Sequence, residues 1–228
     1  MRVAATDAPV RRAPTRGVAP PLPSRQPAIV RATSVVWELL VFAAATWRAI
    51  LTPPYSWKYE FIDQAWLLFK RGSIPCAVSA AGFGYGAPGL QGTALTDSFG
   101  DINRVAAIVG AATIREQAVW VTGMVVAGVV GTAICADLGA RKIRDELDAL
   151  AVIGVDQIRR LVAPRVLAIT LLMPALGLLV IVTEFYAIML AYLVYGGNTG
   201  EFLEAGAYSF AAVDILVFLA KTVVVGAI

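Results

Sequence analysis

The side chains that could do chemistry in this sequence are ionisable groups set inside apolar stretches. Arg115 and Glu116 are adjacent in one stretch, Glu184 lies in another, and Asp214 and Lys221 are seven residues apart in the last. A charge at membrane depth is costly and usually faces a cavity or a partner, so these groups are candidates for a functional site. The alternative for the Arg115-Glu116 pair is a place at the outer membrane interface. Asp214 and Lys221 can share one helix face, although two turns is too far for a direct salt bridge.

Most familiar enzyme chemistries are excluded by composition. The chain has no histidine, so it cannot supply a Ser-His-Asp triad, an imidazole base, a zinc site containing His or axial His ligation to haem. It has no Gly-x-x-x-x-Gly-Lys-[Ser/Thr] loop to hold a nucleotide phosphate. Cys76 and Cys135 lie in different apolar segments, which favours two small buried side chains over a redox pair. We expect no catalytic residue, no metal and no cofactor.

The overall composition indicates a membrane protein. Of the 228 residues, 58% are apolar and 15% are charged, whereas soluble domains have about half apolar and a quarter charged. The apolar stretches are long enough for helices that cross a bilayer. The predicted fold class is therefore all-α, a polytopic integral membrane helix bundle.

The basic residues predict the topology of this bundle. Residues 1–71 hold ten Lys and Arg against four Asp and Glu, and residues 137–165 hold six against five. From 166 onward Lys221 is the only basic residue. By the positive-inside rule, the N-terminus and 137–165 face the cytoplasm and the loop at 196–200 faces outward. No basic stripe interleaved with aromatic residues indicates a nucleic-acid partner.

The N-terminal third is expected to lie outside the bundle. Residues 1–32 are rich in Pro and Arg and predict a disordered cytoplasmic tail. Residues 33–71 predict interfacial helices, the first over 35–51, capped by Thr33 or Ser34 and stopped by Pro53. This first helix either lies in the headgroup plane, which its Trp and Arg content favours, or makes a short span.

Residues 72–228 are expected to form the membrane domain. Predicted spans cover 74–95, 102–137, 161–195 with a kink at Pro174, and 211–228. Small residues let neighbouring helices approach closely. We expect three glycines to serve helix packing: Gly128, Gly131 and Gly139.

The stretch ICADLGARKIRDELDAL, Ile134–Leu150, has an amphipathic pattern. Ile143, Leu147 and Leu150 recur at helical spacing, with charged residues between them. It is either a loop helix resting on the bilayer or a docking helix that transmits force from a soluble partner. Gly154 then ends this helix and Asp156 caps the next one. Three arginines that follow are expected to be cytoplasmic anchors: Arg159, Arg160 and Arg165.

These motifs resemble the MlaE/YrbE permeases, the membrane subunits of ABC transporters that work with MCE proteins to move lipids. The resemblance rests on Ile134–Asp156, APRVLA at 163–168, the Arg115-Glu116 pair and FLAKT at 218–222. Together with KYEFIDQAW at 58–66, the sequences of these motifs are most similar to those of the A-type YrbE proteins of actinobacterial mce operons. Family members continue beyond the position of Ile228, so the resemblance suggests a truncated C-terminus.

The resemblance implies a role for each motif. The permeases are paired, and the helix matching Arg141–Leu150 docks on the cytoplasmic ATPase. The implied lipid path at the dimer interface involves Arg115 and Glu116, with Glu184 as a further candidate. The implied coupling residues are Arg141, Arg144, Asp145, Glu146, Leu147, Asp148 and Leu150.

The expected function is a permease subunit in the plasma (inner) membrane, multi-pass, with a cytoplasmic N-terminus. Its expected partners are a second YrbE-type permease chain, the ABC ATPase, MCE lipid-binding proteins and a membrane lipid. The alternatives are a scaffold that assembles partners without moving lipid, and a membrane-bound enzyme that modifies lipids. For the enzyme, the carboxylates are too scattered to nominate a catalytic group.

Overall fold

The computed structural model describes residues 28–53 and 57–228, and every regular element in these residues is a helix. The predicted all-α class is confirmed. The chain divides into two compact units, 1–40 and 41–228, and each is considered by itself. The predicted disordered tail lies outside the described residues except for 28–32, which are helical.

Helix α1 (Ala28–Leu51) begins earlier than its sequence pattern predicts. Thr33 and Ser34 lie inside the helix, so the prediction that either caps it is wrong. Its C-terminal end at Leu51 agrees with the prediction, because Pro53 cannot continue an α-helix. Within the second unit, the Trp47 indole N–H donates to the carbonyl oxygen of Ala227 at 3.3 Å.

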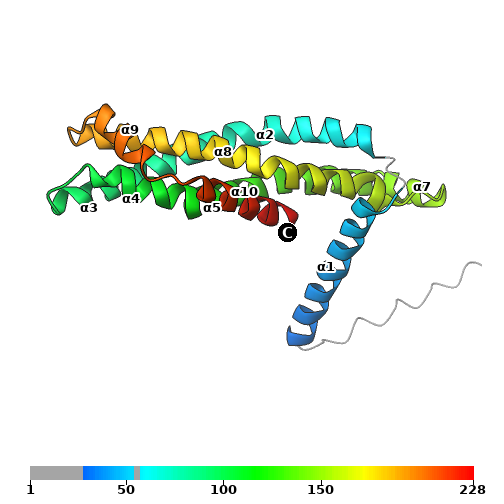
Figure 1. Cartoon of the computed structure of the whole chain (residues 1–228). Coiled ribbons are helices and arrows are strands. Elements are labelled where there is room, and N and C mark those ends of the chain that lie inside the picture. Colours follow the sequence, from blue (N-terminus) through cyan, green and yellow to red (C-terminus); the bar gives the residue numbers. More distant parts are fainter. Residues whose placement is uncertain (1–27, 54–56) are drawn as a thin grey trace, which may run out of the picture. The chain divides into compact units, whose positions relative to one another are not determined.

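The second unit contains long helical rods joined by short turns (Figure 1). Several rods contain π-helical turns, written η, where the helix widens without stopping. In chain order the elements are α2 (Lys58–Gly84), η1 (Tyr85–Gln91), α3 (Gly92–Ser98), α4 (Arg104–Ala112), η2 (Thr113–Gln117), α5 (Ala118–Val125), η3 (Val126–Gly131), α6 (Thr132–Ile143), α7 (Glu146–Val152), η4 (Ile158–Val162), α8 (Ala163–Val194), α9 (Thr199–Ala207) and α10 (Ala212–Ala227).

Helix α8 is the centre of this unit. It packs against α2, α10 and α5, and it is apolar on all sides, as expected for a helix surrounded by protein and lipid. The core around it includes Cys76, Ala118, Val180 and Phe218, all with no exposed surface. A second apolar cluster beside α9 contains Tyr192, which is buried and whose ring is tilted by 42° against the ring of Phe202. Cys135 is exposed, so the expectation of two buried cysteines is correct only for Cys76.

Three helices are long and apolar enough to cross a membrane, namely 33–51, 104–143 and 158–194. The pair α9 and α10, bent by 79°, would make a fourth span if it crosses as one. The predicted span at 74–95 is not among them, because its Gly, Ser and Pro residues lower the mean hydropathy. It belongs to one uninterrupted rod from Lys58 to Ser98 that packs along α8. The predicted domain border at residue 72 therefore falls inside α2.

The other predicted spans differ from the structure only in detail. The rod predicted over 102–137 runs from Arg104 to Ile143, so its C-terminal end is longer than expected. Helix α8 runs through Pro174 without ending, and Pro164 lies in its first turn. Gly154 has a left-handed φ of +75°, and the Asp156 side chain accepts from the N–H groups of Ile158 and Arg159. The predicted helix stop at Gly154 and cap at Asp156 are confirmed.

Two glycines set the distance between α8 and its neighbours. A Cβ atom at Gly84 in α2 would lie 2.7 Å from Cγ and 2.9 Å from the carbonyl oxygen of Glu184. A Cβ atom at Gly177 in α8 would lie 2.5 Å from the ring of Phe218 in α10. Since these separations are shorter than real carbon contacts allow, both helix pairs depend on a missing side chain.

Substitution of Gly84 by Ala is expected to destabilise the fold. The added methyl group would meet backbone atoms of α8, which cannot move without separating the two helices. We expect a cost of about 1–3 kcal/mol, seen as a melting temperature lower by several degrees in the detergent-solubilised chain. The matched control is Gly82→Ala, since a Cβ at Gly82 meets nothing within 4 Å. Equal losses in both variants would contradict this account.

Candidate functional site

Four charged residues form two ion pairs between η2 and α10, which we call the η2–α10 ion pairs. The Arg115 guanidinium donates from Nε to Asp214 Oδ1 at 2.9 Å and from Nη2 to Oδ2 at 3.3 Å. Lys221 Nζ donates to Glu116 Oε1 at 2.6 Å and to the Arg115 carbonyl oxygen at 2.9 Å. The two-point contact of Arg115 fixes orientation as well as distance.

Local helix geometry positions these groups. Asp214 and Lys221 are seven residues apart in α10, so both project from one face toward η2. Asp214 also accepts from the N–H of Ala211 at the start of α10, which holds its carboxylate in place. The shared face is confirmed, and each group pairs with η2 and not with the other. The sequence prediction missed this pairing between the two helices. It could have been inferred, because each helix carries one acidic and one basic residue.

The η2–α10 ion pairs lie on the outside of the described chain. The side chain of Arg115 is 57% exposed and that of Glu116 is 76% exposed. Arg115 is eleven residues inside the rod that begins at Arg104, which is roughly 16 Å along the helix axis. The site is therefore an exposed cluster of charges well inside a helix apolar enough to span a membrane.

Glu184 is placed apart from this cluster. Its side chain has no exposed surface, and both carboxylate oxygens lack a hydrogen-bond partner in the described residues. It lies where α8 passes close to α2, beside Gly84. The structure thus brings Arg115 and Glu116 together with Asp214 and Lys221, and leaves Glu184 inside the α2–α8 contact.

The predicted amphipathic helix over 141–150 is two pieces in the structure. Helix α6 ends at Ile143 and α7 begins at Glu146, with Asp145 between them at φ 55° and ψ 15°. Aspartate tolerates this left-handed conformation better than most residues, and the prediction of one continuous helix is wrong for this reason. Ile143 is 85% exposed, while Leu147 and Leu150 are half-buried.

Ion pairs brace this α6–α7 elbow, which we define as residues 141–152. Arg144 Nε donates to Glu146 Oε1 at 2.7 Å, and Lys142 Nζ donates to Asp148 Oδ1 at 2.7 Å. The hydrogen bond and the charge of Glu146 raise the pKa of the Arg144 guanidinium above its ordinary value. All four side chains are more than 40% exposed, so the elbow presents both signs of charge to its surroundings.

A line of ion pairs connects the elbow to the bundle, and we call it the elbow relay. Glu146 contacts Arg141 at 3.7 Å, and Arg141 contacts Asp137 at 3.2 Å. Asp137 then pairs with Arg165 in α8, whose Nε lies 3.4 Å from Gln64 Oε1 in α2. One line of contacts therefore joins α7, α6, α8 and α2.

Arg165 corrects a prediction. It is 3% exposed and paired with Asp137, so it is an interhelical contact and not an exposed cytoplasmic anchor. Arg160 is exposed, and Arg159 donates to the Thr52 hydroxyl at 2.8 Å. The sequence held an indication of this burial, because Arg165 has apolar residues on both sides. Arg159 and Arg160 are instead adjacent to each other.

The three glycines predicted to pack helices have no close neighbour in the described chain. A Cβ at Gly128 or Gly139 would meet nothing within 4 Å, and one at Gly131 would meet only the carbonyl of Val126 at 3.9 Å. Gly131 instead lines an apolar cavity of about 370 Å³ between η3, α8 and α10. Any packing at these glycines must therefore involve atoms outside the described residues.

Comparison with known proteins identifies the family. A family model described as "Permease MlaE" matches residues 61–228. The chain belongs to the MlaE permease family. It is a multi-pass membrane protein and the permease subunit of an ABC transporter. It is not itself an enzyme.

Several curated proteins are similar to this chain. A "Probable ABC transporter permease protein" of Rickettsia bellii is 26% identical over 201 residues, covering 86% of this chain and 76% of that protein. The "Intermembrane phospholipid transport system permease protein MlaE" of Haemophilus influenzae is 34% identical over 93 residues, covering 41% and 36%. "Protein TRIGALACTOSYLDIACYLGLYCEROL 1, chloroplastic" of Arabidopsis thaliana is 32% identical over 129 residues, covering 56% and 37%.

Exchange of charges across one pair tests whether the η2–α10 ion pairs hold α10 in place. Lys221→Glu would put two carboxylates face to face, and we expect the melting temperature of the solubilised chain to fall by several degrees. The double variant Lys221→Glu with Glu116→Lys restores opposite charges, so it should recover at least half of that loss. No recovery in the double variant would contradict a pairwise interaction.

Proposed function

We propose that this MlaE-family chain is the permease of an ABC transporter that moves lipids, coupled to ATP hydrolysis in a separate ATPase. The family match over 61–228 supports the permease role. Lipid as the substrate is supported by the name of the Haemophilus relative, which is a phospholipid transport permease. The observation that carries the coupling is the elbow relay, which joins an exposed charged elbow to two helices of the bundle.

The α6–α7 elbow is the proposed docking segment for the ATPase. It lies at one end of the second unit (Figure 1) and exposes charged side chains beside the apolar side chain of Ile143. Closure of the ATPase would displace α7. The displacement would then reach α8 and α2, because Glu146, Arg141, Asp137 and Arg165 are linked by ion pairs. The coupling residues named from the sequence all lie on or beside this elbow.

The proposed lipid path runs beside the η2–α10 ion pairs. Their side chains face outward from this chain, so a second permease chain on that side would enclose them. A phosphate of a lipid headgroup would compete with Asp214 for Arg115 and with Glu116 for Lys221, because both cations bind phosphate as they bind carboxylate. Glu184 would reach such a path only if α2 and α8 separate.

The proposed setting follows the charge distribution and the family. The α7 end carries most of the basic residues of the bundle, so it would face the cytoplasm of the plasma (inner) membrane, as would the N-terminus. The proposed partners are a second YrbE-type permease chain, the ATPase and MCE lipid-binding proteins. The uncovered glycines at 128, 131 and 139 would suit the permease pair. The finer assignment to the A-type YrbE group rests on the amino-acid sequences of the motifs alone.

Lipid transfer in reconstituted vesicles tests the function directly. Vesicles holding the chain, its paired permease, the ATPase and an MCE protein should transfer fluorescent phospholipid when ATP is added. A Walker-motif variant of the ATPase that cannot hydrolyse ATP is the control, and it should reduce transfer to background. Intact assembly without ATP-dependent transfer would contradict a permease and indicate a scaffold.

Charge reversal in the elbow tests the coupling. Asp145→Lys with Glu146→Lys should abolish co-purification of the ATPase, because the elbow loses two acidic groups and the first link of the relay. Membrane insertion should be unchanged, since both residues lie outside the predicted spans. The matched control is Glu201→Lys with Glu204→Lys, two exposed acidic residues on α9 at the opposite end. Normal ATPase recovery with the elbow variant would reject this docking site.

A further inference from the structure

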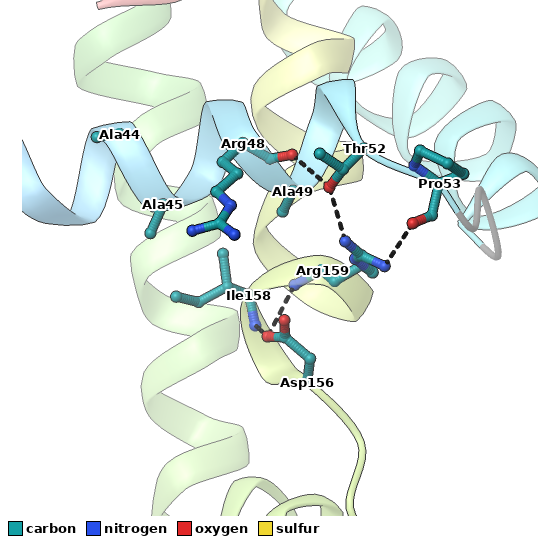
Figure 2. A pocket seen from close by; sticks show the side chains of 9 residues that line it. All are labelled: Ala44, Ala45, Arg48, Ala49, Thr52, Pro53, Asp156, Ile158 and Arg159. Carbon is teal, nitrogen blue, oxygen red and sulfur yellow. Dashed lines mark hydrogen bonds between the residues drawn. The ribbon is translucent and has the colours of Figure 1, made fainter.

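A cavity of about 640 Å³ lies between the C-terminal part of α1 and the segment that leads into α8. It shares no lining residue with the η2–α10 ion pairs or with the elbow relay. We call it the Arg48–Arg159 pocket. Figure 2 shows the residues that line it: Ala44, Ala45, Arg48, Ala49, Thr52, Pro53, Asp156, Ile158 and Arg159.

Arg159 is held in position in this pocket. Its guanidinium donates from Nη2 to the Thr52 hydroxyl at 2.8 Å and from Nη1 to the Pro53 carbonyl oxygen at 3.3 Å. Both acceptors are neutral, so the positive charge of Arg159 is oriented without being neutralised. Each terminal nitrogen of a guanidinium carries two N–H groups, and one on each nitrogen is left for a ligand.

Arg48 supplies a second cation from the other wall. Its side chain leaves α1 above Ile158, on the same side of the helix as Ala45 and the pocket (Figure 2). In the residues that the structure describes, no carboxylate oxygen lies within 4 Å of a guanidinium nitrogen of Arg48 or Arg159. Two positive charges thus face one cavity without an acidic partner.

The one acidic residue in the lining, Asp156, has a different task. Its Oδ1 accepts from the N–H groups of Ile158 at 3.0 Å and Arg159 at 3.3 Å, which caps the helix that begins there. Because these N–H groups are occupied, the helix end is not the anion-binding element. With two arginines against one aspartate, the lining carries a net positive charge of one.

The rest of the lining is apolar. Ala44, Ala45 and Ala49 form the α1 wall, and Ile158 forms the opposite wall. The pocket lies where one candidate span ends, at Leu51, and another begins, at Ile158. In a membrane that both helices cross, such a place is at the depth of lipid headgroups, where basic pockets between helices bind anionic lipids.

We propose that the Arg48–Arg159 pocket is a binding site for a phosphate-bearing anion, either a lipid headgroup or free phosphate. Paired guanidinium groups recognise phosphate through several charge-assisted hydrogen bonds, and the small alanine side chains leave room beside them. The site shares no residue with the proposed coupling segment or lipid path, and it does not depend on the proposed transport function. Binding there would tie α1 to the start of α8.

Native mass spectrometry of the full purified chain tests the site. The chain is titrated with dioleoylphosphatidylglycerol in one arm and with inorganic phosphate in the other. We expect one saturable site whose affinity falls about fivefold in Arg48→Gln, since one arginine near a membrane surface contributes on that order. Arg159→Gln should lower the affinity by at least as much.

The controls separate this site from general attraction to positive charge. Arg160→Gln removes a charge from the exposed neighbour of Arg159 that does not line the pocket, and it should leave the affinity unchanged. Arg48→Gln is the decisive variant, because the Arg48 side chain makes no hydrogen bond or ion pair with the residues that the structure describes. Lipid binding that withstands millimolar phosphate assigns the headgroup as ligand, and binding of phosphate alone with the same dependence on Arg48 assigns free phosphate. Equal affinity in the wild type and Arg48→Gln, or an equal loss in Arg160→Gln, would overturn the proposal.

Discussion

Hydrocarbon offers no hydrogen bonds, and this constraint explains why ion pairs join the helices of the second unit. Inside the candidate spans, Arg115 and Glu116 are paired with charges on α10. At the α7 end, the buried Arg165 is paired with Asp137. An unpaired charge in either place would cost far more than the pair contributes in stability. The ion pairs therefore determine which helices must stay together, more than they determine how stable the bundle is.

Helix α10 makes apolar contacts on one side and ion pairs on the other. On one side, Phe218 fills the space left by Gly177 in α8. On the other side, Asp214 and Lys221 hold η2. A change at the η2–α10 ion pairs would consequently alter the contact between α10 and α8, because α10 is a short, stiff helix between the two contacts. This arrangement is suited to a permease in which a substrate site and a packing interface must respond together.

The two ends of the unit are built differently. The α9 end is closed by aromatic packing, with Tyr192 and Phe202 buried and 5.3 Å apart between ring centroids. The α7 end is joined by ion pairs in which every side chain except Arg165 is exposed or half-exposed, and such pairs rearrange more easily than packed rings. A displacement of α7 would thus first move the end that is joined by ion pairs, and the end closed by aromatic packing would move last. That asymmetry agrees with the proposed direction of energy flow from the ATPase to the bundle.

The sequence by itself determined the helical class, the polar ends, the helix stop at Gly154 and the cap at Asp156, because these depend on composition and on neighbours within a few residues. It also located the ionisable groups of the η2–α10 ion pairs. Only the tertiary structure decided their partners, the burial of Arg165 and of Glu184, and which glycines meet another helix. A sequence pattern shows which face of a helix is small or charged, but not which helix lies against that face. The break at Asp145 belongs to the same class, since amphipathic spacing continued through it and only the backbone of the folded chain revealed the left-handed residue.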